Sequence, residues 1–181
     1  KRKKGSSKVS LPKRCPSCKN DLVKIEGEAI LRCTMGLDCP AQRIGALIHF
    51  VSRNALNIDG LGERIIELLV DKNLVLNFAE LFRLEIKDIV DLEGFGEKSA
   101  TNLIRSIQES RETTLPRFIY SLGIREVGEA TAMNLALNFN NITNFLSAKE
   151  EDLLEINDIG PVASNFIKEF LALEENISLV K

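Results

Sequence analysis

The sequence predicts a mostly α-helical protein in which a small four-cysteine finger precedes a compact, all-helical domain. Three observations support this prediction. All four cysteines of the 181-residue chain lie in one short segment, between Cys15 and Cys39. From Ala41 onward, apolar residues recur three and four positions apart, as on one face of a helix, and no long alternating pattern typical of strands occurs. A short glycine-containing segment also returns four times in this second part.

The composition is that of an ordinary globular protein, with 44% hydrophobic and 28% charged residues. A chain of this length buries a real core, so disordered, collagen-like and fibrous structures are excluded. No run approaches the ~18 apolar residues of a membrane span, and the first residues are charged, unlike a signal peptide. We therefore expect a cytoplasmic protein without membrane contact. Because the chain opens on Lys1 rather than Met, we expect it to be a piece of a longer protein.

Basic residues are concentrated at the start of the chain. Residues 1–14 hold seven Lys or Arg residues and no acidic one, whereas the rest of the chain carries 17 basic and 26 acidic residues, a net charge of −9. We interpret residues 1–13 as a basic linker, or the tail of a preceding domain, rather than as a phosphate-binding arm. The acidic remainder argues against a nucleic-acid partner unless the contacts are local and made by backbone groups.

Residues 14–40 are predicted to form a zinc finger. Two residues separate Cys15 from Cys18, fourteen separate Cys18 from Cys33, and five separate Cys33 from Cys39. Two close pairs joined by a hairpin-sized segment can place four thiolates at the corners of a tetrahedron, as Zn²⁺ requires. Two disulfides are the alternative, which a cytosolic location disfavours. Four cysteines fill the coordination sphere, so the zinc is expected to be structural and not catalytic.

The only histidine, His49, lies on a helix predicted from the apolar residues between Ile44 and Val51. A lone histidine on such a helix is interpreted as a packed core residue rather than as a metal ligand or a base. No histidine-based catalytic site is therefore predicted.

The helical domain, residues 41–181, is predicted to contain four glycine turns, which end on Gly62, Gly96, Gly128 and Gly160 at intervals of 34, 32 and 32 residues. Glycines allow positive φ and leave no Cβ in the way of an approaching backbone. The N–H groups that open the following helix attract an anion. The turns are therefore expected to clamp phosphates with main-chain groups, while Leu61 and Phe95 point inward. A side chain at Gly96 is expected to block a phosphate and also to strain the turn.

The candidate phosphate contacts are glycines of these turns and the cations beside the first three of them, whose side chains are expected to reach phosphates. The fourth turn carries Asn157 and Asp158 and has no nearby cation, so it is expected to be the weakest contact. The predicted set is Gly60, Gly62, Arg64, Gly94, Gly96, Lys98, Gly123, Arg125, Gly128 and Gly160.

Glycine turns can also simply connect helices or mediate protein contacts. Four turns at a nearly constant period favour DNA binding over both of these alternatives. A dinucleotide-binding site is excluded, because the third glycine of its fingerprint is missing and no strand precedes either Gly60-x-Gly62 or Gly94-x-Gly96.

These turns resemble the helix-hairpin-helix motif, whose pairs dock across the minor groove of DNA and grip the sugar-phosphate backbone without reading sequence. The order of parts, a four-cysteine finger followed by four such motifs, is similar to the C-terminal half of bacterial NAD-dependent DNA ligases. The resemblance covers roughly residues 12–175. The strings that carry it are Cys15-Pro16-Ser17-Cys18, Cys39-Pro40-Ala41-Gln42, His49-Phe50-Val51-Ser52-Arg53, Asp59-Gly60-Leu61-Gly62 and Leu122-Gly123-Ile124-Arg125-Glu126-Val127-Gly128-Glu129-Ala130-Thr131.

The resemblance implies that the parent protein joins 5′-phosphate and 3′-hydroxyl ends at nicks in replication and repair, with NAD as the adenylate donor. NAD and Mg²⁺ would bind outside this chain. The family's nucleophilic lysine lies in a Lys-x-Asp-Gly motif, whereas Asp59-Gly60 follows Asn57 and Ile58. The chain alone is therefore expected to be inactive and to bind duplex DNA as a monomer. The alternatives are a non-catalytic DNA-binding module of another repair or recombination protein, and a protein-interaction scaffold.

Overall fold

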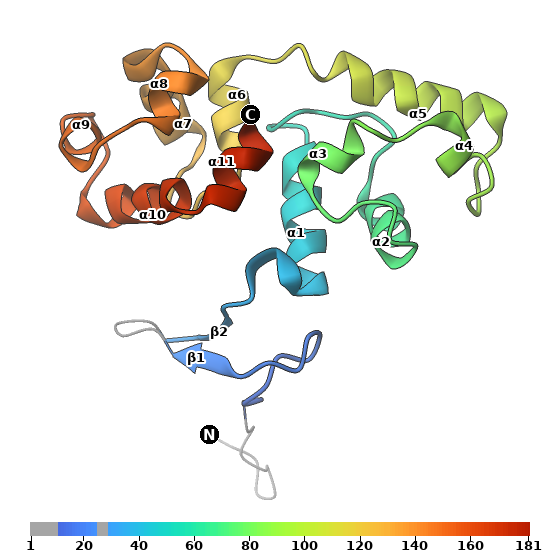
Figure 1. Cartoon of the computed structure of the whole chain (residues 1–181), viewed down its shortest axis with the longest axis horizontal. Helices are drawn as coiled ribbons and strands as arrows, with labels where there is room; N and C mark the ends of the chain where they lie inside the picture. The colour runs from blue at the N-terminus through green and yellow to red at the C-terminus, as the bar shows by residue number, and fades with distance from the viewer. Residues whose placement is uncertain (1–10, 25–28) are drawn as a thin grey trace, which may run out of the picture. The chain divides into compact units, whose positions relative to one another are not determined.

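The computed structural model describes residues 11–24 and 29–181, so the basic segment predicted over residues 1–13 lies largely outside the described residues. The chain divides into two compact units, with the boundary between Arg43 and Ile44. Figure 1 shows short strands near the N-terminus and helices through the rest of the chain. The predicted fold class, a small cysteine finger followed by an all-helical domain, is confirmed.

The first unit is built on a two-stranded antiparallel hairpin. Strand β1 (Leu22–Lys24) pairs with strand β2 (Leu31–Cys33), and Leu22 lies opposite Cys33. A 3₁₀ turn, η1 (Gly36–Asp38), then leads to Cys39 and to helix α1 (Pro40–Val51). Among the described residues of this unit only Cys15 and Cys39 are buried. The described part of the unit therefore has almost no apolar core, and we expect its stability to come from the cysteine cluster.

The second unit contains helices only, among the residues described. Apolar residues line one face of each long helix, as Ile66, Leu69 and Val70 do in the second helix. Its elements after α1 are α2 (Glu63–Asp71), α3 (Phe78–Leu81), α4 (Ile86–Ile89), α5 (Glu97–Glu109), α6 (Leu115–Ser121), α7 (Glu129–Phe139), α8 (Ile142–Leu146), α9 (Glu150–Leu154), α10 (Pro161–Ala172) and α11 (Glu174–Val180).

This helical unit has two halves, residues 44–109 and residues 115–180, and each half has its own apolar core. Leu47, Ile66 and Ile107 are fully buried in the first core. Leu135 and Phe145 are fully buried in the second. Figure 1 shows helices α2 to α5 on one side of the unit and helices α7 to α10 on the other. The partly buried Phe118 of α6 packs against both cores.

The two halves repeat each other in their capping interactions. Asn77 and Asn141, which are 64 positions apart, cap α3 and α8 by accepting hydrogen bonds from the backbone N–H groups of residues 80 and 144. Asp88 and Asp152, also 64 positions apart, accept hydrogen bonds from the residues that precede α4 and α9. The fourfold sequence repeat is therefore a pair of pairs. Each half carries two glycine turns.

Candidate metal centre and nucleic-acid interface

The first pair of cysteines is held by a tight turn. Lys19 adopts a left-handed conformation with φ 64°, and its N–H donates to the Cys15 carbonyl over 3.0 Å. The Cys15 N–H in turn donates to the Asn20 carbonyl over 2.8 Å. These two bonds fold residues 15–20 back on themselves, so that Cys15 and Cys18 direct their sulfur atoms toward the same point.

The second pair comes from the other side of the hairpin. Cys33 is the last residue of β2, and Cys39 immediately precedes α1. The Gln42 side chain donates to the Cys33 carbonyl over 2.5 Å, and Arg43 Nε donates to the Leu37 carbonyl over 2.9 Å. The first turn of α1 thus ties down the segment that carries both cysteines.

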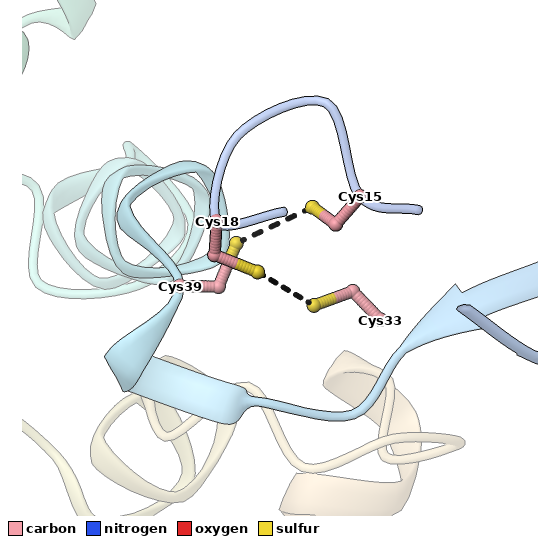
Figure 2. Close-up of side chains that lie close together, drawn as sticks. All are labelled: Cys15, Cys18, Cys33 and Cys39. Atoms are coloured by element: carbon pink, nitrogen blue, oxygen red, sulfur yellow. Dashed lines mark hydrogen bonds between the residues drawn. The ribbon is translucent and has the colours of Figure 1, made fainter. Parts of the chain in front are cut away.

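The four sulfur atoms converge, as Figure 2 shows, and all lie within 4.8 Å of one another. The Sγ atoms of Cys15 and Cys39 are 3.8 Å apart, and those of Cys18 and Cys33 are 3.5 Å apart. A zinc ion bound about 2.3 Å from each sulfur in a tetrahedron sets neighbouring sulfurs about 3.8 Å apart. All four cysteines are free thiols, so the disulfide alternative is not formed. Their chemistry and spacing fit a structural Zn²⁺.

The thiols do not ionise alike when they are this close. The backbone N–H of Asn20 favours the Cys18 thiolate and lowers the pKa of Cys18 to about 6. The Met35 N–H also favours the thiolate of Cys33, but desolvation and the neighbouring thiols outweigh it and raise the pKa of Cys33 to about 12. The N–H of Gln42, at the start of α1, lowers the pKa of Cys39. Four thiolates can coexist here only beside a cation, which is what a zinc ion supplies.

The four glycine turns share one backbone geometry. Gly62, Gly96, Gly128 and Gly160 are the N-cap residues of α2, α5, α7 and α10, with extended backbone at ψ near 180°. We name the turns hairpins 1 to 4, comprising residues 57–62, 91–96, 123–128 and 155–160. Each hairpin has a left-handed residue two positions before its closing glycine. These residues are Gly60, Gly94, Glu126 and Asp158, with φ between 62° and 85°.

The expectation that the turn glycines adopt positive φ is therefore right for Gly60 and Gly94 but wrong for the closing glycines. The predicted strain from a side chain at Gly96 is also wrong, because its φ of −144° is open to any residue. Gly123 does have positive φ, 65°, but it lies at the end of α6, five positions before Gly128. Aligning the four turns on their closing glycines would have shown Glu126 and Asp158 in the position of Gly60.

The packing of the fold does not require glycine at the four closing positions. They are exposed, and a Cβ added at Gly62, Gly96, Gly128 or Gly160 would meet nothing within 4 Å. A Ser, Thr, Asp or Asn would cap the helix better than glycine does. What glycine provides is an uncovered helix start, where first-turn N–H groups can meet an external acceptor. Glutamate follows in three cases (Glu63, Glu97 and Glu129), and α10 instead starts with Pro161, which has no N–H.

The predicted cations differ in their surroundings. Arg64 and Lys98 are exposed, on the first turns of α2 and α5. A Cβ at Gly94 would lie 2.9 Å from Nη2 of Arg64, so the Arg64 guanidinium reaches hairpin 2. The Arg125 guanidinium stacks over the Phe166 ring at 4.4 Å, and its Nε lies 3.8 Å from Glu126 Oε1. The Arg64 guanidinium therefore lies near hairpin 2 as well as hairpin 1, and the Arg125 guanidinium packs against Phe166 in α10.

Hairpin 4 has the surroundings least suited to an anion. Asp158 occupies its left-handed position, and Asn134 donates to the Asn157 carbonyl over 3.0 Å. The Lys168 ammonium forms an ion pair with Glu150. The assignment of individual DNA contacts, including the low rank of hairpin 4, stays a prediction.

The same segments of the chain are similar to known protein families. Residues 14–41, which include all four cysteines, match the family model of the NAD-dependent DNA ligase C4 zinc finger domain. Residues 52–109 match a SAM-like helix-hairpin-helix tandem, and residues 117–180 match a helix-hairpin-helix motif. The chain belongs to the zinc finger and helix-hairpin-helix region of NAD-dependent DNA ligases. The cysteine cluster is consistent with the structural zinc finger of this region.

A DNA ligase from Hahella chejuensis is 50% identical over 172 residues, which cover 95% of this chain and 25% of that protein. The chain thus spans about a quarter of the length of this relative. One helix-hairpin-helix match falls within each half of the helical unit, and each half has its own core. Within residues 11–24 and 29–181, no helix is long and apolar enough to cross a membrane.

Proposed function

We propose that this chain is the part of an NAD-dependent DNA ligase that grips duplex DNA through its backbone phosphates. The observation that carries the proposal is the set of four exposed helix starts, each closed by a glycine that the packing does not require. A bare helix N-terminus is suited to a phosphate, since its N–H groups and dipole both favour negative charge. The helix-hairpin-helix matches over both halves support DNA as the source of that phosphate.

Backbone N–H groups and cationic side chains would both contact the phosphates. The N–H groups that follow Gly62, Gly96 and Gly128 would donate to phosphate oxygens, and Arg64, Lys98 and Arg125 would add charge beside them. A groove between hairpins 1 and 2 is lined by Gly60, Gly94, Arg64 and Arg105, together with Asp59 and Glu109. Contacts of this kind fix the position of the duplex without reading bases, which fits binding in the minor groove without sequence preference.

Hairpin 4 would contribute least. Pro161 removes one of the N–H donors that hairpins 1 to 3 offer, and Asp158 places a carboxylate beside the turn. We therefore rank it below the other three hairpins, with a role in packing the second half.

The parent enzyme is proposed to seal nicks by joining 5′-phosphate and 3′-hydroxyl ends, with NAD as adenylate donor and Mg²⁺ bound outside this chain. Because the chain has no Lys-x-Asp-Gly motif, it would carry out no adenylation alone. It would act as a cytoplasmic monomer on nicked duplex. A bound zinc ion would supply no chemistry, since the four thiolates fill its coordination sphere. The ligase-type finger favours this parent over another repair or recombination protein.

Fluorescence anisotropy with labelled duplexes of unrelated sequence, nicked and intact, tests the binding. All sequences should bind within tenfold of one another, a span of about 1.4 kcal/mol. The logarithm of affinity should fall by about 0.9 per phosphate neutralised for each tenfold rise in salt, and Arg125→Ala should lower that slope by roughly one. A preference above tenfold for one sequence would overturn backbone recognition.

A chimaera tests the parent activity. This chain, placed in the Hahella chejuensis ligase instead of its matching segment, should restore nick sealing that deletion of the segment abolishes. The matched control carries Gly62→Val and Gly96→Val and should seal poorly at low DNA concentration. Transfer of labelled AMP to the isolated chain would contradict the proposal that this chain carries out no adenylation alone.

A further inference from the structure

The two halves of the helical unit exchange a reciprocal pair of polar contacts that join hairpin 1 to hairpin 3. We propose that His49 and Arg117 are positioning residues, which hold hairpin 3 in a fixed place relative to hairpin 1 so that both contact one duplex. This inference rests on the proposed function. It adds a role to two residues that lie outside the hairpins, of which His49 packs against Gly123 at the start of hairpin 3.

His49 reaches from α1 in the first half to the end of α6 in the second. It is half-buried, and its Nε2 lies 2.7 Å from the Tyr120 carbonyl oxygen. Because a carbonyl only accepts, Nε2 must carry the proton. The imidazole also meets the Tyr120 ring edge to face, with centroids 4.7 Å apart, and lies 3.3 Å from where a Cβ on Gly123 would be. It therefore packs against the first residue of hairpin 3.

Arg117 makes the opposite connection, from α6 to the segment between α1 and hairpin 1. Its Nε donates to the Ala55 carbonyl over 2.8 Å, and its Nη2 donates to the Arg53 carbonyl. A planar guanidinium suits two carbonyls at once, because its donors are fixed in a fork. In the same region Asn54 donates to Glu129, the first residue of α7, over 2.8 Å. Each half thus holds the backbone that leads into the other half's hairpin.

This junction matters because the two cores are distinct, although Phe118 packs against both. Burial fixes each hairpin within its own half, but the relative position of hairpins 1 and 3 depends on what crosses between the halves. Two sites that must engage one ligand gain affinity only if their geometry allows simultaneous contact. Phosphates along a duplex have fixed spacing, so a loose junction would let hairpin 3 miss its phosphate while remaining folded.

Two variants of His49 separate positioning from simple packing. His49→Gln keeps an amide donor at a similar reach, whereas His49→Phe keeps a ring against Tyr120 but removes the donor. We expect His49→Phe to weaken binding of the zinc-loaded chain to nicked duplex about tenfold and to lower the salt slope by about one unit. His49→Gln should retain affinity within threefold. Arg117→Met and Arg117→Lys form a second pair with the same expectation, because the lysine can still donate to one carbonyl.

A double-mutant cycle gives the deciding readout. If hairpin 3 no longer reaches the duplex in His49→Phe, then Gly128→Val should cost less than twofold in that background, although it costs about tenfold in the unsubstituted chain. Gly96→Val, in hairpin 2, should cost the same in both backgrounds. Thermal melts of every variant establish that binding is measured on folded protein.

Each outcome bears on a distinct claim. Additive effects of His49→Phe and Gly128→Val, or a change in melting temperature with an unchanged salt slope, would overturn the positioning role and leave the proposed function intact. Absence of duplex binding by the unsubstituted chain would overturn the proposed function itself. If Gln fails to rescue although Lys rescues at position 117, the role belongs to Arg117 alone, and the assignment of His49 is wrong.

Discussion

Two alanine substitutions in hairpin 2 lie only two positions apart. One should lower the stability of the fold, and the other should weaken DNA binding. Gly94 has φ 85°, whereas Gly96 has φ −144°. Gly94→Ala is expected to lower the free energy of unfolding and to affect DNA binding mainly through displacement of the Arg64 guanidinium. Gly96→Ala is expected to leave stability nearly unchanged and to weaken DNA binding.

The magnitudes follow from the backbone and the neighbouring atoms. An alanine in the left-handed region costs roughly 1–2 kcal/mol, of which about 0.4–1 kcal/mol is recovered because the unfolded chain loses freedom. At Gly94 a Cβ would also lie 2.9 Å from the Arg64 guanidinium, which must move away. The net loss is therefore about 1 kcal/mol, or roughly 2–4 °C in melting temperature for a domain of this size. At Gly96 the Cβ meets nothing within 4 Å, and the weaker cap and the entropy gain nearly cancel.

Differential scanning calorimetry and fluorescence anisotropy on both variants provide the test. Gly96→Ala should bind duplex DNA several-fold more weakly while melting within about 1.5 °C of the parent, equivalent to ~0.5 kcal/mol. Gly160→Ala is the matched control, since it has the same open geometry in the hairpin ranked weakest. The reasoning is refuted if Gly96→Ala destabilises the chain as much as Gly94→Ala, or if Gly160→Ala loses as much affinity as Gly96→Ala.

Three further predictions concern the finger and the second core. Cys33→Ser should abolish zinc binding and unfold the finger, because structural zinc contributes on the order of 10 kcal/mol, while the helical unit keeps its own melting transition in circular dichroism. Zinc affinity should rise with pH, because Cys33, with its pKa raised to about 12, must release a proton when zinc binds at pH 7. Zinc affinity should fall more steeply once the pH drops below about 6, because Cys18 is then protonated too. Calorimetry in buffers of different ionisation enthalpy would count the proton released at pH 7, and a count of zero would contradict the assignment. Ser164→Ala should raise the melting temperature by about 2–4 °C, corresponding to about 1 kcal/mol. The reason is that Ser164 Oγ is buried with no hydrogen-bond partner among the residues described. A lower melting temperature in calorimetry would contradict this prediction.

The sequence was informative where the physics is local. Zinc ligation depends on the spacing of Cys15, Cys18, Cys33 and Cys39, which the chain spells out directly, and the structure brings their sulfurs together. Helix periodicity likewise predicted the buried faces of α1 and α2. The four glycine turns were recognisable because their closing residues recur at a nearly constant interval.

The conformation of each glycine was not readable in the same way. Gly60 and Gly62 are the same residue type in one short string, and only the backbone shows that the first is left-handed and the second extended. The contact between His49 and Tyr120 joins residues 71 positions apart and follows no periodic pattern. Such a contact exists only because two separately packed halves meet, so single-sequence reasoning had no signal for it. His49 was interpreted as a packed core residue, whereas it is half-buried and hydrogen-bonds the Tyr120 carbonyl.

The acidic balance of the helical unit bears on how it could hold DNA at all. A domain that carries glutamates at the first position of α2, α5 and α7 cannot rely on a broad positive field. Those glutamates stabilise the uncovered helix starts through the helix dipole while no DNA is bound. The proposed N–H donors follow the closing glycines, where a Cβ on the glycine would meet nothing within 4 Å. Long-range electrostatic attraction between the domain and DNA would then be weak. Binding would be strong only where the backbone N–H groups fit the phosphates closely. A surface built this way would favour a duplex held in one geometry over nonspecific accumulation on charged polymers, as the proposed phosphate contacts require.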